Sequence, residues 1–360
     1  MRYVPVNCLR EGQKLGKTLY GKNNELLLSE GKALSKTLIG SIKRLGYCGV
    51  YIEDDISRDI EIVNVISDKL RNETIKGIKR LYLQTSSGKP TVESKQELHD
   101  NIEKIVDELL ENKDVMVNMI DLKNFDNYTY AHSVNVAVLS IIIGIALDLN
   151  RNTLIKLGLG AILHDIGKVF INKGILNKPG KLTEVEFSKI KKHSMLGYKY
   201  IRDRFKLPTI SHGAILEHHE RYDGTGYPAN KCGEDITFFG RIVAIADVYD
   251  ALTSRRPYRK AMNPADSLEY IMGNSGTAFD SDLVEVFVHK IAPYPVGTTV
   301  VLSNGYIGIV LENYELLSLR PKIRVFKIGN KEVTPFEINL KDDYSYLNVT
   351  ILDVINEIAS

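Results

Sequence analysis

The sequence predicts a multidomain protein in which a central all-α domain is flanked by a small N-terminal α+β domain and a small C-terminal β-domain. The chain has 360 residues, which is more than a single hydrophobic core usually accommodates. Residues 96–290 show helical periodicity without sustained strand-like alternation, whereas residues 293–360 contain two hairpin signals. These three observations predict the fold class.

Segment 1–60 is expected to form the small α+β domain, to which we assign a regulatory role. Short apolar runs alternate there with turn signals, and one stretch has helical spacing that ends at Gly46. The expected strands lie at 3–6, 26–28 and 50–52, and the expected helix lies at 35–45.

Residues 61–125 are expected to form a helical connector. A charged stretch with helical spacing runs over 67–84. The Ser-, Gly- and Pro-containing sequence at 85–94 indicates a linker or a break between helices. The connector leads into the central domain.

The central helical domain is expected over 126–292. Asn150 or Asn152 can cap a helix that carries the sequence His-Asp-Ile-Gly-Lys at 164–168. A Thr-x-x-Glu capping box at 183–186 begins another helix, which is expected to run toward the next proline. A further helix, over 241–254, has its apolar residues on one face.

The C-terminal β-domain is expected over 293–360. Asn304-Gly305 and Gly329-Asn330 each lie between two β-rich runs, which is the usual signature of a hairpin. No chemical motif accompanies these strands, so the sequence predicts a fold for this domain and no activity.

The composition argues against several kinds of partner. Lys and Arg total 47 against 45 Asp and Glu, and a net charge of +2 gives no general attraction to DNA, RNA or a membrane surface. The three cysteines are odd in number and have no Cys-x-x-Cys spacing, which disfavours both disulfides and a thiolate metal site. The expected compartment is the reducing cytoplasm.

No targeting or membrane segment is expected. The N-terminus lacks the apolar region of a signal peptide. Residues 127–147 are uncharged and long enough to cross a bilayer, but they include His132, Ser133 and Asn135. We interpret this stretch as a buried core helix.

Six of the eight histidines lie between residues 132 and 219. A lone histidine on an apolar helix is usually an ordinary core residue, but His164-Asp165 and His218-His219 are adjacent pairs on separate expected helices. Asp247 lies within an apolar helix, where an unpaired carboxylate would be strongly destabilising. A divalent metal would satisfy all of them, and imidazoles with carboxylates suit iron, manganese, nickel or zinc.

The candidate ligands outnumber what one ion needs, so two ions that share a bridging carboxylate, Asp165, are expected. Two ions roughly 3.5–4 Å apart can share a hydroxide and hold the oxygens of a phosphate during in-line displacement. Lys168 lies one helical turn after His164 and would meet charge that develops on that phosphate; an ordinary helix-end lysine is the alternative.

The pattern His132, His164-Asp165, Asp247 resembles the H…HD…D signature of the HD superfamily of metal-dependent phosphohydrolases. The sequences HDIGK, KKHSMLGY, HHERYDGTGYP and DVYDALTSRRPYR resemble the HD-GYP branch in order and spacing. This resemblance covers about residues 126–290, under half of the chain. It implies an HD-type helical domain over 126–292 that hydrolyses a cyclic dinucleotide, typically cyclic di-GMP, at a bimetal centre often occupied by iron or manganese.

The resemblance also implies residue roles. Asp165 would bridge the metals, Lys168 would hold the scissile phosphate, and Gly226 with Tyr227 would shape the substrate loop. Arg256 and Arg259 would contact the substrate, since guanidinium groups match phosphate or a guanine edge. The implied metal ligands are His132, His164, Asp165, His193, His218, His219 and Asp247.

One position departs from the branch members that hold a third metal. They have a glutamate four residues before the first ligand histidine, and this chain has Tyr128 there. We therefore expect two metals and linear pGpG as the main product, formed by attack of a metal-bridging hydroxide.

Two alternatives stay open. The domain could bind a cyclic dinucleotide with weak or no turnover and act as a sensor, or it could hydrolyse another nucleotide such as cyclic GMP-AMP. The N-terminal domain resembles domains that precede HD-GYP domains elsewhere and could bind a ligand or mediate dimerisation, which leaves a homodimer open.

Several other polar residues have a simpler interpretation. His212 is expected in the core or beside a ligand, and Asp250 is expected to fix a neighbouring ligand or arginine. The basic cluster Lys189, Lys191 and Lys192 is expected to be a solvated helix face.

Overall fold

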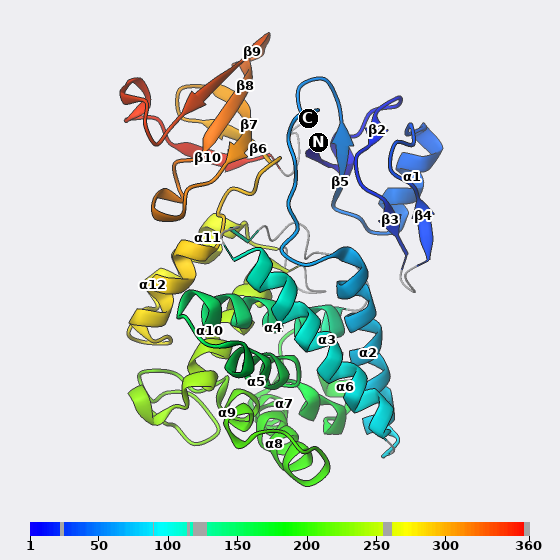
Figure 1. Cartoon of the computed structure of the whole chain (residues 1–360), viewed down its shortest axis with the longest axis vertical. Coiled ribbons are helices and arrows are strands. Elements are labelled where there is room, and N and C mark those ends of the chain that lie inside the picture. Colours follow the sequence, from blue (N-terminus) through cyan, green and yellow to red (C-terminus); the bar gives the residue numbers. More distant parts are fainter. Residues whose placement is uncertain (22–24, 89, 114–115, 118–127, 255–260, 356–360) are drawn as a thin grey trace. The chain divides into compact units, whose positions relative to one another are not determined.

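A computed structural model describes residues 1–21, 25–88, 90–113, 116–117, 128–254 and 261–355. The described residues form two compact units (Figure 1). Among the described residues, the helical unit takes in those within 65–113 and 128–290, and the β-rich unit takes in those within 1–64, 116–117 and 291–355. The predicted fold class, a central helical domain with an N-terminal α+β part and a C-terminal β part, is confirmed. The finer division at residues 60, 125 and 292 stays a prediction.

The helical unit is built around α4 (Tyr128–Ala146), which packs against α5 (Arg151–Ile162) and α10 (Phe238–Thr253). Of the described helices, α4 is long and apolar enough to cross a membrane by composition, but 78% of its window 129–146 is buried inside the fold. The expected core helix is therefore found. The remaining elements are α2 (Asp68–Ser86), α3 (Val92–Glu111), η2 (Ile166–Phe170), α6 (Lys173–Leu176), α7 (Glu184–Lys191), α8 (His193–Arg204), α9 (Thr209–Glu217), η3 (Gly233–Asp235), α11 (Pro264–Gly273) and α12 (Ser281–Lys290).

Local sequence signals explain where several of these helices begin. Ser67 caps α2, Asn150 caps α5, and Thr183 with Glu186 forms the expected capping box of α7. In each case the capping side-chain oxygen accepts a hydrogen bond from a backbone amide of the first turn.

Two helix expectations were wrong at their C-terminal ends. The α5 helix ends at Ile162, so residues 164–168 lie in a tight turn and in η2 instead of continuing the helix. The helix that begins after Thr183 ends at Lys191, and α8 begins at His193. Both ends place a histidine where the backbone changes direction, and these histidines belong to the candidate site.

The N-terminal part of the β-rich unit contains an antiparallel sheet with strand order β1-β5-β2. Its apolar core includes Val4, Leu15 and Ile52. The elements are β1 (Arg2–Pro5), η1 (Val6–Cys8), β2 (Lys14–Leu15), β3 (Leu19–Tyr20), β4 (Leu26–Leu28), α1 (Lys36–Arg44) and β5 (Gly49–Glu53).

The C-terminal part forms a five-stranded antiparallel sheet with strand order β10-β6-β7-β8-β9. Both expected hairpins are present, with Gly305 between β6 and β7 and Gly329 between β8 and β9, each at positive φ. The elements are β6 (Thr299–Leu302), β7 (Tyr306–Glu312), η4 (Glu315–Leu317), β8 (Lys322–Ile328), β9 (Lys331–Asn339), η5 (Tyr344–Tyr346) and β10 (Ile351–Val354).

Candidate metal centre

The ends of three helices and internal positions of two others bring the seven predicted ligands together. His164-Asp165 follows the end of α5, His193 is the first residue of α8, and His218-His219 follows the last residue of α9. The other two, His132 and Asp247, project from α4 and α10. Ligands at helix ends can converge on one point because the chain turns there.

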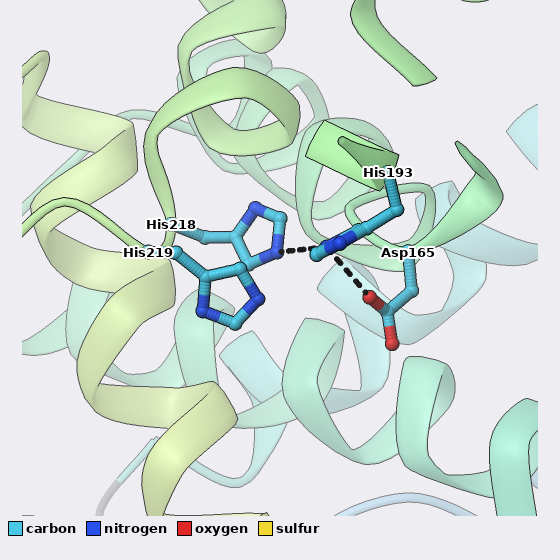
Figure 2. Close-up of side chains that lie close together, drawn as sticks. All are labelled: Asp165, His193, His218 and His219. Carbon is cyan, nitrogen blue, oxygen red and sulfur yellow. Dashed lines mark hydrogen bonds and ion pairs between the residues drawn. The ribbon is translucent and has the colours of Figure 1, made fainter. Parts of the chain in front are cut away.

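The donor atoms of these residues form two groups. Asp165, His193, His218 and His219 make one group, and His132, His164 and Asp247 make the other; within each group the donor atoms lie within 4.8 Å of one another. Figure 2 shows the first group, with the ring of His193 between Asp165 and His218. Six of the seven side chains are buried, and His219 is partly exposed. The cluster therefore offers more donor atoms than one cation needs. The number of cations and the role of each residue stay predictions.

Asp165 faces both groups. Its Oδ1 atom lies 3.4 Å from His193 Nε2 in the first group. Its Oδ2 atom lies 3.4 Å from His164 Nε2 and 3.8 Å from His132 Nε2 in the second group. A carboxylate can donate one oxygen to each of two cations, so Asp165 can reach both groups from this position. Asp247 also has an oxygen on each side, with Oδ1 3.1 Å from His132 Nε2 and Oδ2 3.9 Å from His219 Nδ1.

The backbone orients three of the imidazoles. The Nδ1 atoms of His164 and His193 lie 2.7 and 2.8 Å from the carbonyl oxygens of Ala161 and Ile190. His218 Nδ1 lies 3.1 Å from a carbonyl of α9 in the same way. Because a carbonyl only accepts, each Nδ1 carries the proton, and Nε2 turns an unprotonated lone pair toward the site in the neutral imidazole.

His132 is oriented by a side chain instead. Its Nδ1 lies 2.7 Å from Asp250 Oδ2, and Asp250 is fully buried. The other oxygen of Asp250 accepts a hydrogen bond of 2.7 Å from Asn135 Nδ2. A carboxylate behind a ligand histidine fixes the ring and makes it a stronger donor. This contact agrees with the expected role of Asp250 as a residue that fixes a neighbouring ligand.

The electrostatics of the cluster suit cation binding. Burial disfavours charge on Asp165, but Lys168 and the histidines more than offset it and hold the pKa of Asp165 well below its usual range. Burial lowers the pKa of His218 well below its ordinary value and that of His219 to about 3, although Asp247 opposes the shift at His219. Ionised carboxylates and neutral imidazoles are the forms that bind metals.

His132 is the exception. Burial lowers its pKa, but the carboxylates of Asp247 and Asp250 outweigh burial and raise it to about 9. Without a metal, this ring therefore carries a proton at neutral pH, and a cation must displace it.

Two buried atoms at the centre support the fit to a metal. His164 Nε2 and Asp165 Oδ1 are buried, and neither makes a hydrogen bond within the part of the chain that the structure describes. A buried polar atom without a hydrogen bond is costly, by about 1–3 kcal/mol. Coordination to a divalent cation would satisfy both atoms, so the residues present fit a metal.

Lys168 lies beside this cluster. Its ammonium donates a hydrogen bond to Asp165 Oδ2, and its side chain is 31% exposed. It reaches this place from η2, three residues after Asp165. Gly167 makes the turn possible, because a Cβ atom there would lie 1.9 Å from the carbonyl oxygen of His193.

The loop with Gly226, Tyr227 and Pro228, here called the Gly-Tyr-Pro loop, lies against His219 of the first group. The ring of Tyr227 stacks on His219 with centroids 4.7 Å apart. Gly226 lies against the backbone of Arg221, and a Cβ there would come within 2.3 Å of the Arg221 amide nitrogen. Arg256 and Arg259, the expected substrate contacts, lie outside the described residues.

Sequence reasoning missed the residues that support the loop. Glu220 is buried, and its carboxylate accepts hydrogen bonds from the amides of Ala229 and Lys231. Lys191, expected on a solvated face, is half-buried and places its ammonium 5.1 Å from the centre of the Tyr227 ring. The short distance between Glu220 and the histidine pair in the sequence was the available signal.

The HD domain family matches residues 114–283 of the chain. A cyclic di-GMP phosphodiesterase of Pseudomonas aeruginosa is 38% identical over 234 residues, which are 65% of this chain and 56% of that protein. A 3′3′-cGAMP-specific phosphodiesterase of Vibrio cholerae is 38% identical over 155 residues, 43% of this chain and 34% of that protein. The chain thus spans about half or less of these curated relatives.

A solved structure has the same fold. The HDG"Y"P protein from Bdellovibrio bacteriovorus aligns with a TM-score of 0.51 at 20% identity, and the alignment covers 79% of this chain and 97% of that one.

Proposed function

The chain carries an HD domain of the HD-GYP type, and from this premise we propose that it is a metal-dependent phosphodiesterase that hydrolyses cyclic di-GMP, mainly to linear pGpG. The observation that carries the proposal is the position of Asp165, whose two oxygens face two separate groups of ligands. Phosphodiester hydrolysis is the chemistry to which a two-cation site of this kind is suited.

The seven donor residues would hold two divalent cations, iron or manganese being favoured over zinc or nickel. When bound, such cations supply an activated water and neutralise negative charge on the phosphate. His132, His164 and Asp247 would hold one cation, and His193, His218 and His219 would hold the other, with Asp165 shared between them. Buried imidazoles and ionised carboxylates would keep the cations while excluding bulk water.

The chain's other residues would position the substrate. The ammonium of Lys168 is partly exposed beside Asp165, so it can bind an oxygen of the scissile phosphate. Tyr227, held by its stack on His219, would place the substrate loop over the site, and Arg256 and Arg259 would contact phosphate or guanine.

The second candidate substrate is cyclic GMP-AMP, because a relative of similar identity carries a name specific for it. The two substrates differ in one base, so the groups that read the base edges would decide between them. We place the enzyme in the cytoplasm, without a membrane or nucleic-acid partner. The oligomeric state that we consider beside the monomer is a homodimer.

The test is turnover by protein purified without oxygen, with metal content measured on the same sample. Cyclic di-GMP and cyclic GMP-AMP are each supplied to the wild type and to Asp165→Ala. The matched control is His99→Ala, which removes a partly exposed histidine from α3, outside the cluster. We expect pGpG from the wild type and from His99→Ala, and none from Asp165→Ala.

Two results would contradict the proposal. Tight binding of cyclic di-GMP without product, in a metallated wild type, would make the protein a sensor. Cleavage of cyclic GMP-AMP alone would keep the enzyme and change its substrate.

A further inference from the structure

A buried arginine from outside the HD domain match lies behind the metal centre. Arg71 belongs to α2, which ends at Ser86, 28 residues before the matched segment 114–283 begins. Only 3% of Arg71 is exposed. A buried guanidinium is costly unless its donors are used, so its partners indicate what it does.

A series of hydrogen bonds through two residues connects Arg71 with the ligand His132. Its Nη2 atom donates a hydrogen bond of 3.0 Å to Asn135 Oδ1. Asn135 Nδ2 donates one of 2.7 Å to Asp250 Oδ1, and Asp250 Oδ2 accepts one of 2.7 Å from His132 Nδ1. All four side chains are buried. Each contact is a hydrogen bond with a defined direction.

Arg71 and Asp250 together fix the direction of the Asn135 amide. The amide can present either its oxygen or its NH₂ group to a neighbour, and only the NH₂ group suits a carboxylate. Because Arg71 has donors and no acceptor, it requires the oxygen on its own side. The NH₂ group is thereby turned to Asp250, which keeps Asp250 in place for His132.

The same helix contacts the site region at a second place. The ring of Tyr82 packs edge-on against Tyr130 of α4, with centroids 5.5 Å apart. Burial and the nearby charge of Asp165 raise the pKa of the Tyr82 phenol. One turn further, Thr85 accepts a hydrogen bond of 3.2 Å from Tyr200 of α8. Helix α2 therefore follows the cluster over several turns.

We propose that Arg71 is a positioning residue for the metal centre, so that α2 is a working part of the catalytic unit although it lies outside the matched domain. This inference rests on the metal centre proposed above. It assigns to Arg71 the orientation of His132 through Asn135 and Asp250, with no contact to metal or substrate.

The experiment measures Mn²⁺ affinity of the metal-free full-length chain by titration, alongside its thermal unfolding. Arg71→Met removes the donors and keeps an apolar stem, and Arg71→Lys restores one donor. The matched control is Arg80→Met, an arginine of α2 that pairs with Glu97 on the surface. Loss of a side chain that contacts a ligand histidine directly typically weakens metal binding by about 10- to 100-fold. Arg71 lies two residues further from His132, so a loss at the lower end, about tenfold, is expected.

We expect that loss in Arg71→Met, an intermediate loss in Arg71→Lys and none in Arg80→Met. In the double variant with Asn135→Ala, the loss should equal that of Asn135→Ala alone, because both residues act through one chain of bonds. If the losses in affinity from Arg71→Met and Asn135→Ala multiply in the double variant, Arg71 does not act through Asn135 and the inference is overturned. If Arg71→Met lowers the melting temperature and leaves the Mn²⁺ affinity unchanged, Arg71 has a structural role only, which also overturns it. A wild type that binds no Mn²⁺ would overturn the metal centre itself.

Discussion

His132 Nε2 lies 3.1 Å from Asp247 Oδ1, within a site where the opposite nitrogen of the same ring is bonded to a second carboxylate, Asp250. Two carboxylates hold one buried imidazole in its protonated form. In the metal-free centre, His132 Nε2 therefore carries a proton. A cation that binds at this nitrogen would displace it.

Metal binding should consequently release about one proton per chain at pH 7.5. The pKa of His132, about 9, lies above that pH, so the ring is protonated before the metal binds. Apparent affinity should rise about tenfold per pH unit up to pH 9 and level off above it, where the proton has already left. Calorimetric titration in buffers of different ionisation enthalpy counts the proton. Asp250→Asn should diminish the release; an unchanged value would contradict this origin.

Gly167→Ala should disrupt the site through the backbone. The added methyl group would overlap the carbonyl of His193, so η2 and the start of α8 must separate. Overpacking of this kind costs about 1–3 kcal/mol. The free energy of unfolding in urea measures it, and Gly273→Ala, whose added Cβ meets nothing within 4 Å, serves as the control. Equal stability of the two variants would argue against a tight contact.

Glu220→Ala should loosen the Gly-Tyr-Pro loop. Without the carboxylate, the amides of Ala229 and Lys231 lose their acceptor, and the loop no longer has a fixed position over His219. We expect kcat/KM for the dinucleotide to fall about tenfold, which corresponds to about 1.4 kcal/mol. Steady-state kinetics compare it with Glu220→Gln, which keeps an acceptor, and with the exposed Glu234→Ala. A loss in Glu234→Ala of the same size would disprove the assignment.

Lys191→Met should have a smaller effect on the same loop. Its ammonium lies over the face of Tyr227, and a contact of this type contributes about 0.5–1 kcal/mol at an exposed site. The corresponding loss in kcat/KM is about two- to fivefold. Lys192→Met, which changes the exposed neighbour, should match the wild type. If the two variants have the same kinetics, Lys191 has no role in the loop and belongs to a solvated helix face, as the sequence predicted.

The sequence indicated the candidate donor residues, but it did not indicate the residues that orient them. The reason is physical. Histidines beside aspartate or histidine are conspicuous in any sequence, and their spacing resembled a known pattern. Arg71 looks like one more charge on a charged helix, and its partner Asn135 is 64 residues away. It is buried in a fold where α2 packs against α3, α4 and η2, and sequence spacing does not show this packing. The turn after α5 was missed likewise, because it depends on contact between Gly167 and the backbone of His193.

Metal stoichiometry should separate a shared ligand from an ordinary one. If Asp165 serves both groups, the wild type should hold two ions per chain. Removing a ligand of one group, as in His164→Ala, should leave about one ion, because the other group keeps its four donors. Asp165→Ala should lower the content further than His164→Ala, since each group loses an oxygen. Elemental analysis after desalting measures this. One ion in the wild type, or equal contents in the two variants, would exclude a bridging role, because a ligand of a single cation cannot affect the occupancy of both groups.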